Sequence, residues 1–323
     1  MKLLDRLETM TKGTPHAQLI KFHFSGKLAN QTIRYSDEHV TIPVEHQMSK
    51  RDEAFQILPL NIVEMGGKHH RSIIESLDAW VEGERMEGSN QLACDFLPKS
   101  SDGSTQKANG LRRTCIGTLP NTLIFHLKRF GLDYQTFESY KINSYCEFPE
   151  LLDMKKYTAN YLVQQDHMAA EGGREGGEEG GAEKATDDEQ VKDEEDCTYR
   201  LRGVVIHLGV AGGGHYWSLA RNDQNQWMKF NDIEVTSFDA KHNLATEAFG
   251  GTYMQETRDA TTQQNVVNEV DRDHNAYMLY YERVCPTVPV EKEQTEQPPT
   301  EKMEGMKEET EKEKEEIGEE KSS

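Results

Sequence analysis

Three strand-like segments set the strongest constraint on how this chain folds. They are NTLIFHLKRF, YRLRGVVIHLG and NAYMLYYERV, at residues 121–130, 199–209 and 275–284. A helix is expected earlier, in HRSIIESLDAWVEGE, where apolar residues recur every three or four positions. The strand signal lies mainly in the second half of the chain, and strands do not alternate regularly with helices. The pattern therefore predicts an α+β fold with a largely antiparallel sheet.

The negative charge is concentrated in two segments of low complexity. The chain has 323 residues and a net charge of −20, of which residues 166–196 carry −10 and residues 291–323 carry −7. Segments this acidic, with few apolar side chains, bury too little surface to offset the entropy of ordering. We therefore expect one ordered region at residues 1–286, interrupted by a disordered Gly-rich insertion at about 166–196, and a disordered tail at 287–323. The rest carries only −3 and has no basic block, which argues against a nucleic-acid partner.

The cysteines and apolar runs indicate the compartment. No two cysteines have CxxC spacing, and the sequence shows neither an apolar N-terminal signal nor a run of 18 apolar residues. We therefore expect a soluble cytoplasmic or nuclear protein with free thiols and no membrane partner. The five cysteines are Cys94, Cys115, Cys146, Cys197 and Cys285.

A possible catalytic histidine lies in GGGHYWSLARNDQNQWMKFND, residues 212–232. If HYWSLA and QWMKF pair as a hairpin around the polar turn, His215 falls opposite Asn231 and Asp232, with Cβ atoms on the order of 5 Å apart. An oxygen of either residue could accept a hydrogen bond from Nδ1 and leave Nε2 free as a base. A surface or capping histidine remains the alternative. Metal binding is weaker, because no second His or Cys lies at ligand spacing on this hairpin.

Several further segments follow in order along the chain: FSGKLANQTI, EAFQILPLNI, EGSNQLACDF, LPNTLIFHLKRF, KINSYCEFPELLDM, GVVIHLGVAGGGHYWSLARNDQNQWMKFNDIEVT, FGGTYM and NAYMLYYER. With these segments the chain resembles the ubiquitin-specific proteases, a family of papain-like cysteine deubiquitinases. The similarity runs from about residue 15 to 286 and is closest to the large fat-facets-type members. The resemblance implies a papain-like fold, no cofactor, and ubiquitin and ubiquitinated proteins as partners.

By this resemblance, His215 is the general base, Asn231 orients it, and Asp232 helps to polarise the site. The reaction is thiol attack on the isopeptide or peptide carbonyl that follows the C-terminal glycine of ubiquitin, and then hydrolysis of the acyl-enzyme.

The resemblance also implies a narrow channel for the Leu-Arg-Gly-Gly tail of ubiquitin. His207, Gly214, Tyr216 and Phe130 match positions that line it. A slot with glycine walls admits Gly-Gly and rejects bulkier tails. Core packing for Phe130 and a buried, satisfied imidazole for His207 are the alternatives.

The sequence departs from the family in two respects. The segment whose cysteine attacks the carbonyl has no counterpart here, and none of the five cysteines has a comparable setting; the chain corresponds to the fingers and palm and lacks most of the thumb. The two CxxC pairs that hold zinc in many relatives fall at Tyr35 and Glu38, and at Cys94 and Leu97. One thiol of four makes a structural zinc improbable, so we expect no metal and apolar packing in its place.

Three functions remain open. The chain is a region of a hydrolase, which is inactive alone because the nucleophile lies elsewhere; or it is a ubiquitin-binding pseudoenzyme or scaffold; or it is a structural protein that has lost contact with ubiquitin. The retained His215, Asn231 and Asp232 favour the first over the third and do not separate the first from the second.

Overall fold

The computed structural model describes residues 2–14, 17–64, 66–172, 197–258 and 265–284. Its α-helices are α1 (Lys2–Thr11), α2 (Leu19–Phe24), α3 (Val44–Gln47), α4 (Ile73–Glu82), α5 (Ala159–Gly172) and α6 (Ala240–Ala248). The strands of the first half are β1 (Gly26–Arg34), β2 (Met48–Phe55), β3 (Leu58–Asn61), β4 (Glu84–Met86), β5 (Leu92–Ala93), β6 (Lys107–Ala108), β7 (Gly110–Thr118), β8 (Thr122–Lys128), β9 (Phe130–Leu132), β10 (Ser139–Lys141) and β11 (Leu151–Asp153). Those of the second half are β12 (Thr198–Val210), β13 (Gly213–Arg221), β14 (Trp227–Asn231), β15 (Glu234–Ser237), β16 (Thr252–Arg258), β17 (Asn265–Asp271) and β18 (His274–Arg283).

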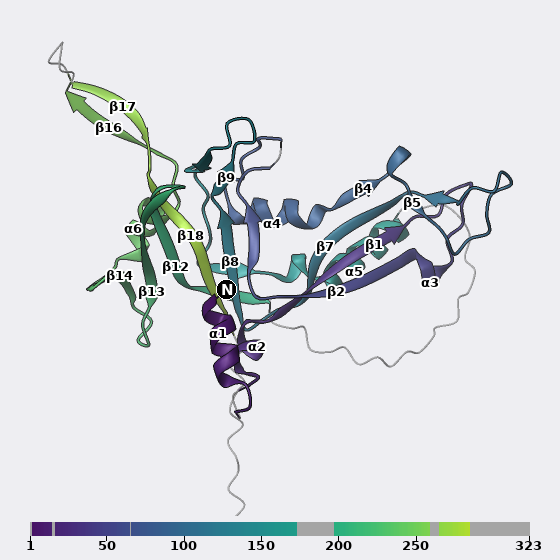
Figure 1. Cartoon of the computed structure of the whole chain (residues 1–323), viewed down its shortest axis with the longest axis horizontal. Coiled ribbons are helices and arrows are strands. Elements are labelled where there is room, and N and C mark those ends of the chain that lie inside the picture. Colours follow the sequence, from purple (N-terminus) through teal and green to yellow (C-terminus); the bar gives the residue numbers. More distant parts are fainter. Residues whose placement is uncertain (1, 15–16, 65, 173–196, 259–264, 285–323) are drawn as a thin grey trace, which may run out of the picture. The chain divides into compact units, whose positions relative to one another are not determined.

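The largest sheet, which we call the palm sheet, confirms the predicted α+β class. Its strands run in the order β15-β14-β13-β12-β18-β8-β3, and β11 pairs with β12 beside this path. The three strand-like segments of the sequence are β8, β12 and β18, and they lie side by side (Figure 1). Their pairings are antiparallel, whereas β3 joins β8 in parallel. The sheet is therefore largely antiparallel, as expected.

The core of the protein lies on one face of the palm sheet. Leu123, Phe125 and Leu127 of β8 are fully buried in it, because alternate residues of a strand point to the same side. Burial of each such side chain stabilises the fold by roughly 1.5–3 kcal/mol. Helix α4 adds Ile73 and Leu77, both fully buried, to the same core. The amphipathic pattern that predicted this helix therefore identified its buried face as well.

A second, four-stranded sheet, which we call the finger sheet, has the order β2-β1-β7-β4. Its long strands lie in the first half of the chain, where the sequence indicated mainly helix. Strand β2 shows why they were missed: its side chains are exposed along nearly its whole length, so no burial-driven alternation marks it. Backbone pairing with β1 over residues 26–33 and 48–55 holds it in place.

Apolar packing fills the place where a zinc site was considered. Cys94 is fully buried with Ile42 and Ala108, and Phe96 and Leu97 pack against this cluster. The packing that we expected at this position is therefore observed. Within the described ranges, no group of three or more His, Cys, Asp or Glu residues could hold a metal ion.

Arg129, in the HLKRF segment, forms hydrogen bonds to several segments that are far apart in the sequence. It is fully buried, and its guanidinium donates to the carbonyls of Ala276 at 2.7 Å, Ile142 at 3.0 Å and Ser144 at 3.0 Å. Burial lowers the pKa of Arg129 to about 10, so it stays charged at neutral pH. The arginine thereby fixes β18 relative to the segment that follows β10.

Helix α5 changes the expected start of the acidic insertion. It continues through residues 166–172, which we had assigned to the disordered segment. Asp166 accepts from the buried Arg113 guanidinium at 2.5 Å, which anchors this part of the helix to β7. The rest of the predicted insertion and the predicted tail at 287–323 lie outside the described residues. Of the helices that are described, none is both long and apolar enough to cross a membrane.

Candidate active site

His215 lies near the start of β13, directly opposite Leu208 of β12. Its side chain is 41% exposed, so a bound molecule can reach the imidazole. Strand β13 pairs with β12 along nearly its whole length, but with β14 only from Ser218 to Arg221. The imidazole therefore lies beyond the last pair of the β13–β14 ladder, where the hairpin opens.

The register of the hairpin places His215 and Asn231 on one face of the sheet. Leu219 pairs with Lys229, so these two side chains share a face. His215 lies four residues before Leu219, and Asn231 lies two after Lys229, and even separations preserve the face. The sequence estimate was off by one position, since Ser218 pairs with Phe230. His215 and Asn231 are diagonal neighbours and not directly opposed residues.

The contact between them uses a different ring nitrogen from the one we expected. Nε2 of His215 lies 2.6 Å from Oδ1 of Asn231. An amide oxygen only accepts hydrogen bonds, so Nε2 must carry the proton. Nδ1 of His215 makes no hydrogen bond within the described part of the chain, and its lone pair is available. The free base is therefore Nδ1, and the expectation that Nε2 would be free is wrong.

Asp232 contributes less than Asn231 to holding the imidazole of His215. Its Oδ2 lies 3.9 Å from Nε2 of His215, beyond hydrogen-bond distance, and its side chain is 76% exposed. The residue has φ 52°, in the tight turn that joins β14 to β15, and aspartate tolerates this left-handed conformation better than most residues. The turn accounts for an aspartate here without any catalytic role.

The four residues matched to the tail channel lie together on the opposite face of β13. The rings of His207 and Tyr216 are 4.6 Å apart, and those of Phe130 and His207 are 5.1 Å apart. Tyr277 closes the cluster, at 5.5 Å from Phe130 and 5.8 Å from Tyr216. Sequence reasoning missed Tyr277, although its place on the strand-like segment NAYMLYYERV was the available signal.

Gly214 has a packing reason that the sequence did not reveal. A Cβ atom at this position would lie 2.1 Å from the Leu208 carbonyl oxygen and 2.3 Å from Nε2 of His207. The room left by the missing side chain is thus taken by His207. At Gly212 and Gly213, by contrast, a Cβ would meet nothing within 4 Å, so the open approach lies at these two glycines.

His207 is buried and uncharged. It is 3% exposed, and its Nδ1 finds no partner within the described ranges. Burial lowers the pKa of His207, and the nearby Lys141 ammonium lowers it further. Nζ of Lys141 donates to the backbone carbonyls of His207 at 2.9 Å and Asp273 at 2.7 Å. Burial also lowers the pKa of Lys141, to about 8.

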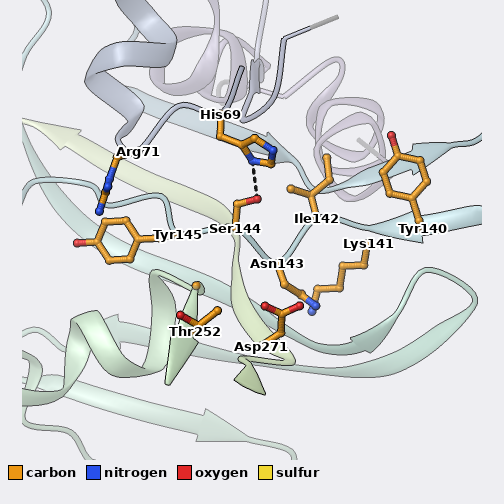
Figure 2. Close-up of a pocket in the computed structure, with 11 residues that line it drawn as sticks. His69, Arg71, Tyr140, Lys141, Ile142, Asn143, Ser144, Tyr145, Thr252 and Asp271 are labelled. Carbon is orange, nitrogen blue, oxygen red and sulfur yellow. Dashed lines mark hydrogen bonds between the residues drawn. The ribbon is translucent and has the colours of Figure 1, made fainter. Parts of the chain in front are cut away.

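A polar cleft of about 610 Å³ lies beside Lys141 (Figure 2). His69 bonds to Ser144 across it, with Nδ1 and Oγ 2.8 Å apart, and Arg71 lies over the ring of Tyr145. Neither His215 nor Asn231 lines this cleft. The hollow and the candidate base are therefore separate features.

The cysteines within the described ranges are all buried. Burial raises the pKa of Cys94, of Cys115 and, to about 11, of Cys146. A nucleophilic cysteine needs the opposite, a lowered pKa and access to substrate. None of these three has the setting of a nucleophile.

Comparison with known proteins identifies a family. The model of the ubiquitin carboxyl-terminal hydrolase family matches residues 1–281. The probable ubiquitin carboxyl-terminal hydrolase FAF of Drosophila melanogaster is 34% identical over 300 residues, which is 91% of this chain and 10% of that protein. Human ubiquitin carboxyl-terminal hydrolase 24 is 33% identical over 288 residues, covering 87% of this chain and 10% of its own length. The chain thus spans about a tenth of the length of these relatives.

Proposed function

The chain belongs to the ubiquitin carboxyl-terminal hydrolase family, and we propose that it forms the histidine side of a thiol-dependent ubiquitin hydrolase. The bond between Nε2 of His215 and Asn231 carries the proposal. It fixes the tautomer and points the unprotonated Nδ1 away from the amide. A half-exposed imidazole held in this way is suited to general-base work.

The steps follow from that tautomer. Nδ1 of His215 takes the proton of a thiol, which then attacks the carbonyl carbon after the last glycine of ubiquitin. The C–N bond breaks, and the leaving amine takes the proton back from Nδ1. Nδ1 next removes a proton from water, which attacks the thioester; the C–S bond breaks, the thiolate takes the proton back from Nδ1, and the carboxylic acid of the released ubiquitin loses its proton to solvent. Asn231 keeps the ring oriented throughout and holds the Nε2 proton.

The thin tail of ubiquitin reaches the base past the glycines that precede it. Gly212 and Gly213 present no side chain and face open space. Beside them, Tyr216 is half exposed, its ring contacts that of His207, and the ring of His207 in turn contacts that of Phe130. An extended Gly-Gly segment fits such an approach, because its backbone can come close without a side chain in the way.

A second function, ubiquitin binding without chemistry, is favoured by the buried cysteines. With Cys94, Cys115 and Cys146 deeply packed and their pKa values raised, this region alone offers no reactive thiol among them. On this proposal the chain recognises ubiquitin and does not cleave it.

Two assays test these functions. The 323-residue chain is mixed with ubiquitin carrying a C-terminal fluorogenic amide, and binding of ubiquitin is measured separately. We expect binding and no turnover above background. Turnover that disappears when one of the five cysteines is substituted would overturn the external nucleophile, and absence of binding would overturn both functions. In a longer protein that contains this region and cleaves ubiquitin, His215→Ala must remove the activity.

A further inference from the structure

The indole of Trp217 forms a wall beside the candidate base. Trp217 lies two residues after His215 on β13, so both side chains point to the same face. Their ring centroids are 6.1 Å apart, and the ring planes meet at 30°. The imidazole is therefore restrained by Asn231 at one nitrogen and by the indole along its face.

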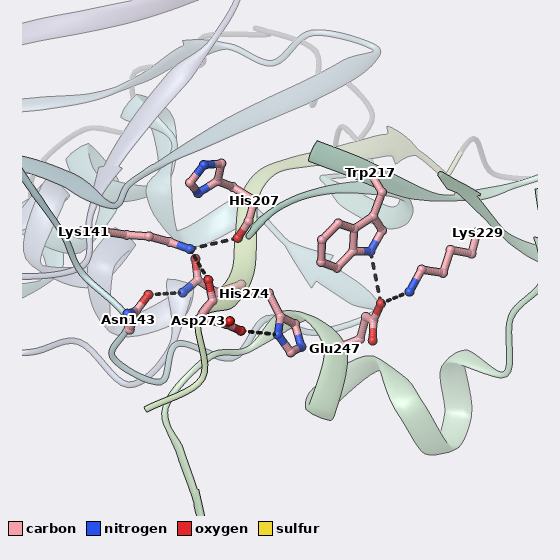
Figure 3. A network of polar contacts seen from close by, with 9 residues as sticks. Lys141, Asn143, His207, Trp217, Lys229, Glu247, Asp273 and His274 are labelled. Atoms are coloured by element: carbon pink, nitrogen blue, oxygen red, sulfur yellow. Dashed lines mark hydrogen bonds and ion pairs between the residues drawn. The ribbon is translucent and has the colours of Figure 1, made fainter. Parts of the chain in front are cut away.

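Two charged side chains hold this indole in place. Nζ of Lys229, on β14, lies 4.9 Å from the centre of the Trp217 ring. Oε1 of Glu247 accepts from Nε1 of Trp217 at 3.1 Å and forms an ion pair with Lys229. Figure 3 shows the carboxylate of Glu247 between the two. Both charged side chains are largely shielded from solvent, with Glu247 21% and Lys229 31% exposed.

The position of Glu247 is set by helix α6 and does not depend on the hairpin. Asp239 caps the start of the helix, because its side chain accepts from the backbone N–H of His242. At its other end Ala248 is fully buried, and Phe249 packs on the core. Because the residue after it is anchored in the core, Glu247 presents its carboxylate from a fixed backbone.

A histidine of β18, the strand on the far side of β12, confines the indole further. The ring centroid of His274, on β18, lies 5.9 Å from that of Trp217. Nδ1 of His274 is 3.1 Å from the carboxylate of Asp273, and that contact fixes the ring (Figure 3). The indole thus has neighbours from three strands and one helix, whereas the imidazole of His215 is 41% exposed.

We propose that Glu247 is a positioning residue for His215, acting through Trp217. The torsion that turns an imidazole is soft and has two broad minima. Turning the ring over would put Cε1 in place of Nε2 and break the bond to Asn231 that fixes the tautomer. By fixing the indole, Glu247 keeps Nε2 on Asn231 and leaves Nδ1 outward. This inference rests on the proposed role of His215 as the base.

The hairpin offers a matched control at its other end. Arg221 lies 4.9 Å over the ring of Trp227 and is paired with Glu150. This set has the same three parts, a cation over an indole and a glutamate on the cation. It differs in lying at the turn end, where the described residues make no contact with His215, so Glu150→Ala removes a corresponding ion pair, whose glutamate is more exposed, without touching the wall beside the imidazole.

The tautomer of His215 is the direct readout. We would label the 323-residue chain with ¹⁵N, record two-bond histidine spectra above the pH at which imidazoles titrate, and assign His215 by its absence in His215→Gln. We expect the Nε2–H form to dominate in the unchanged chain, in Glu247→Gln, which keeps an oxygen for Trp217, and in Glu150→Ala. In Glu247→Ala the nitrogen shifts of His215 should lose their single-tautomer values and move toward those of a free, exchanging imidazole, and Trp217→Leu, which removes the wall itself, should give the same loss.

Two results would overturn the proposal: an unchanged tautomer in both Glu247→Ala and Trp217→Leu, or an equal loss in Glu150→Ala. Backbone amide spectra identify a variant that fails to fold, in which case the other variant decides. The readout needs no catalysis, so it is separate from the proposed function. If His215→Ala leaves a longer, active protein unimpaired, the function fails while the tautomer result stands.

Discussion

The β13–β14 hairpin carries the same assembly of side chains at both ends, and only one end has a candidate for chemistry. Near the turn, Arg221 lies over Trp227; at the open end, Lys229 lies over Trp217, and both cations are 4.9 Å from the ring centres. Each cation is paired with a glutamate from another element. A cation over an indole is therefore a general brace for this hairpin. The open end differs in two respects: its glutamate also accepts from the indole N–H, and His215 is stacked on the indole and bonded to Asn231.

The largest expected effect is on catalytic activity, which should depend on the open end of the hairpin and not on its turn. In a longer protein that contains this region and cleaves ubiquitin, His215→Ala should abolish activity, and Asn231→Ala should lower kcat by about 10- to 10⁴-fold because the base loses its tautomer. Asn225→Gly, in the turn, keeps the positive φ of Asn225 and should leave kcat unchanged. Steady-state rates on a ubiquitin fluorogenic amide measure all three. An Asn231→Ala enzyme as fast as the Asn225→Gly control would remove the role of Asn231.

A difference in stability should separate two glycines at the two ends. Alanine at Gly214 would place Cβ 2.1 Å from a carbonyl oxygen, whereas alanine at Gly203, near the turn end, would place it 3.3 Å from its nearest neighbour. We expect Gly214→Ala to lower the free energy of unfolding by roughly 1–3 kcal/mol through overpacking. Gly203→Ala should change it by less than about 1 kcal/mol. Urea unfolding compares them, and equal losses would contradict the packing argument.

The two cations should contribute similarly to stability and differently to the site. Lys229→Met and Arg221→Met should each lower the free energy of unfolding by about 0.5–1 kcal/mol, since each removes one cation from an indole face. Only Lys229→Met should alter the His215 spectrum, because only its indole touches that ring. If Arg221→Met altered that spectrum as much, the two ends would be coupled and the comparison between them would lose its meaning.

The smallest effect concerns Lys141. This lysine lies near the open end of the hairpin and has no counterpart near the turn. Burial lowers its pKa from 10.5 to about 8, so between these values the unfolded chain binds more protons than the folded one. The free energy of unfolding should therefore rise with pH in this interval relative to Lys141→Met, and the gain should be absent below about pH 8. Solvent screening of this half-exposed side chain keeps the effect small. Parallel curves of unfolding free energy against pH for the two proteins would contradict this prediction, because they would show that the fold does not lower the pKa of Lys141.

Much of the fold could be predicted from local patterns. The alternation in β8 and the three-to-four spacing in α4 identified both elements and their buried faces, because burial leaves a periodic signal. The finger strand β2 left no such signal, since its side chains are exposed. The start of the acidic insertion was set too early because composition does not show that Asp166 has the buried Arg113 as its partner.

The site was predictable to the level of residues and not of atoms. The polar turn predicted a hairpin that brings His215 close to Asn231. An error of one position in the register nevertheless hid the fact that the two residues are diagonal neighbours. Which ring nitrogen of His215 faces Asn231 depends on the rotation of the imidazole, and no sequence pattern encodes that rotation. Trp217 could have been found from its period-two spacing to His215. Glu247 could not, because it reaches the site from a separate helix.

The most direct test of the account asks whether the tail of ubiquitin comes to the open end of the hairpin. The ¹⁵N-labelled chain is titrated with intact ubiquitin and with ubiquitin that lacks its last two glycines, while the signals of Gly212, Gly213 and His215 are followed. We predict that intact ubiquitin shifts these signals and that the shortened form does not, although the shortened form still binds elsewhere on the chain. Equal shifts with both forms, or no shift at His215 with bound intact ubiquitin, would contradict it.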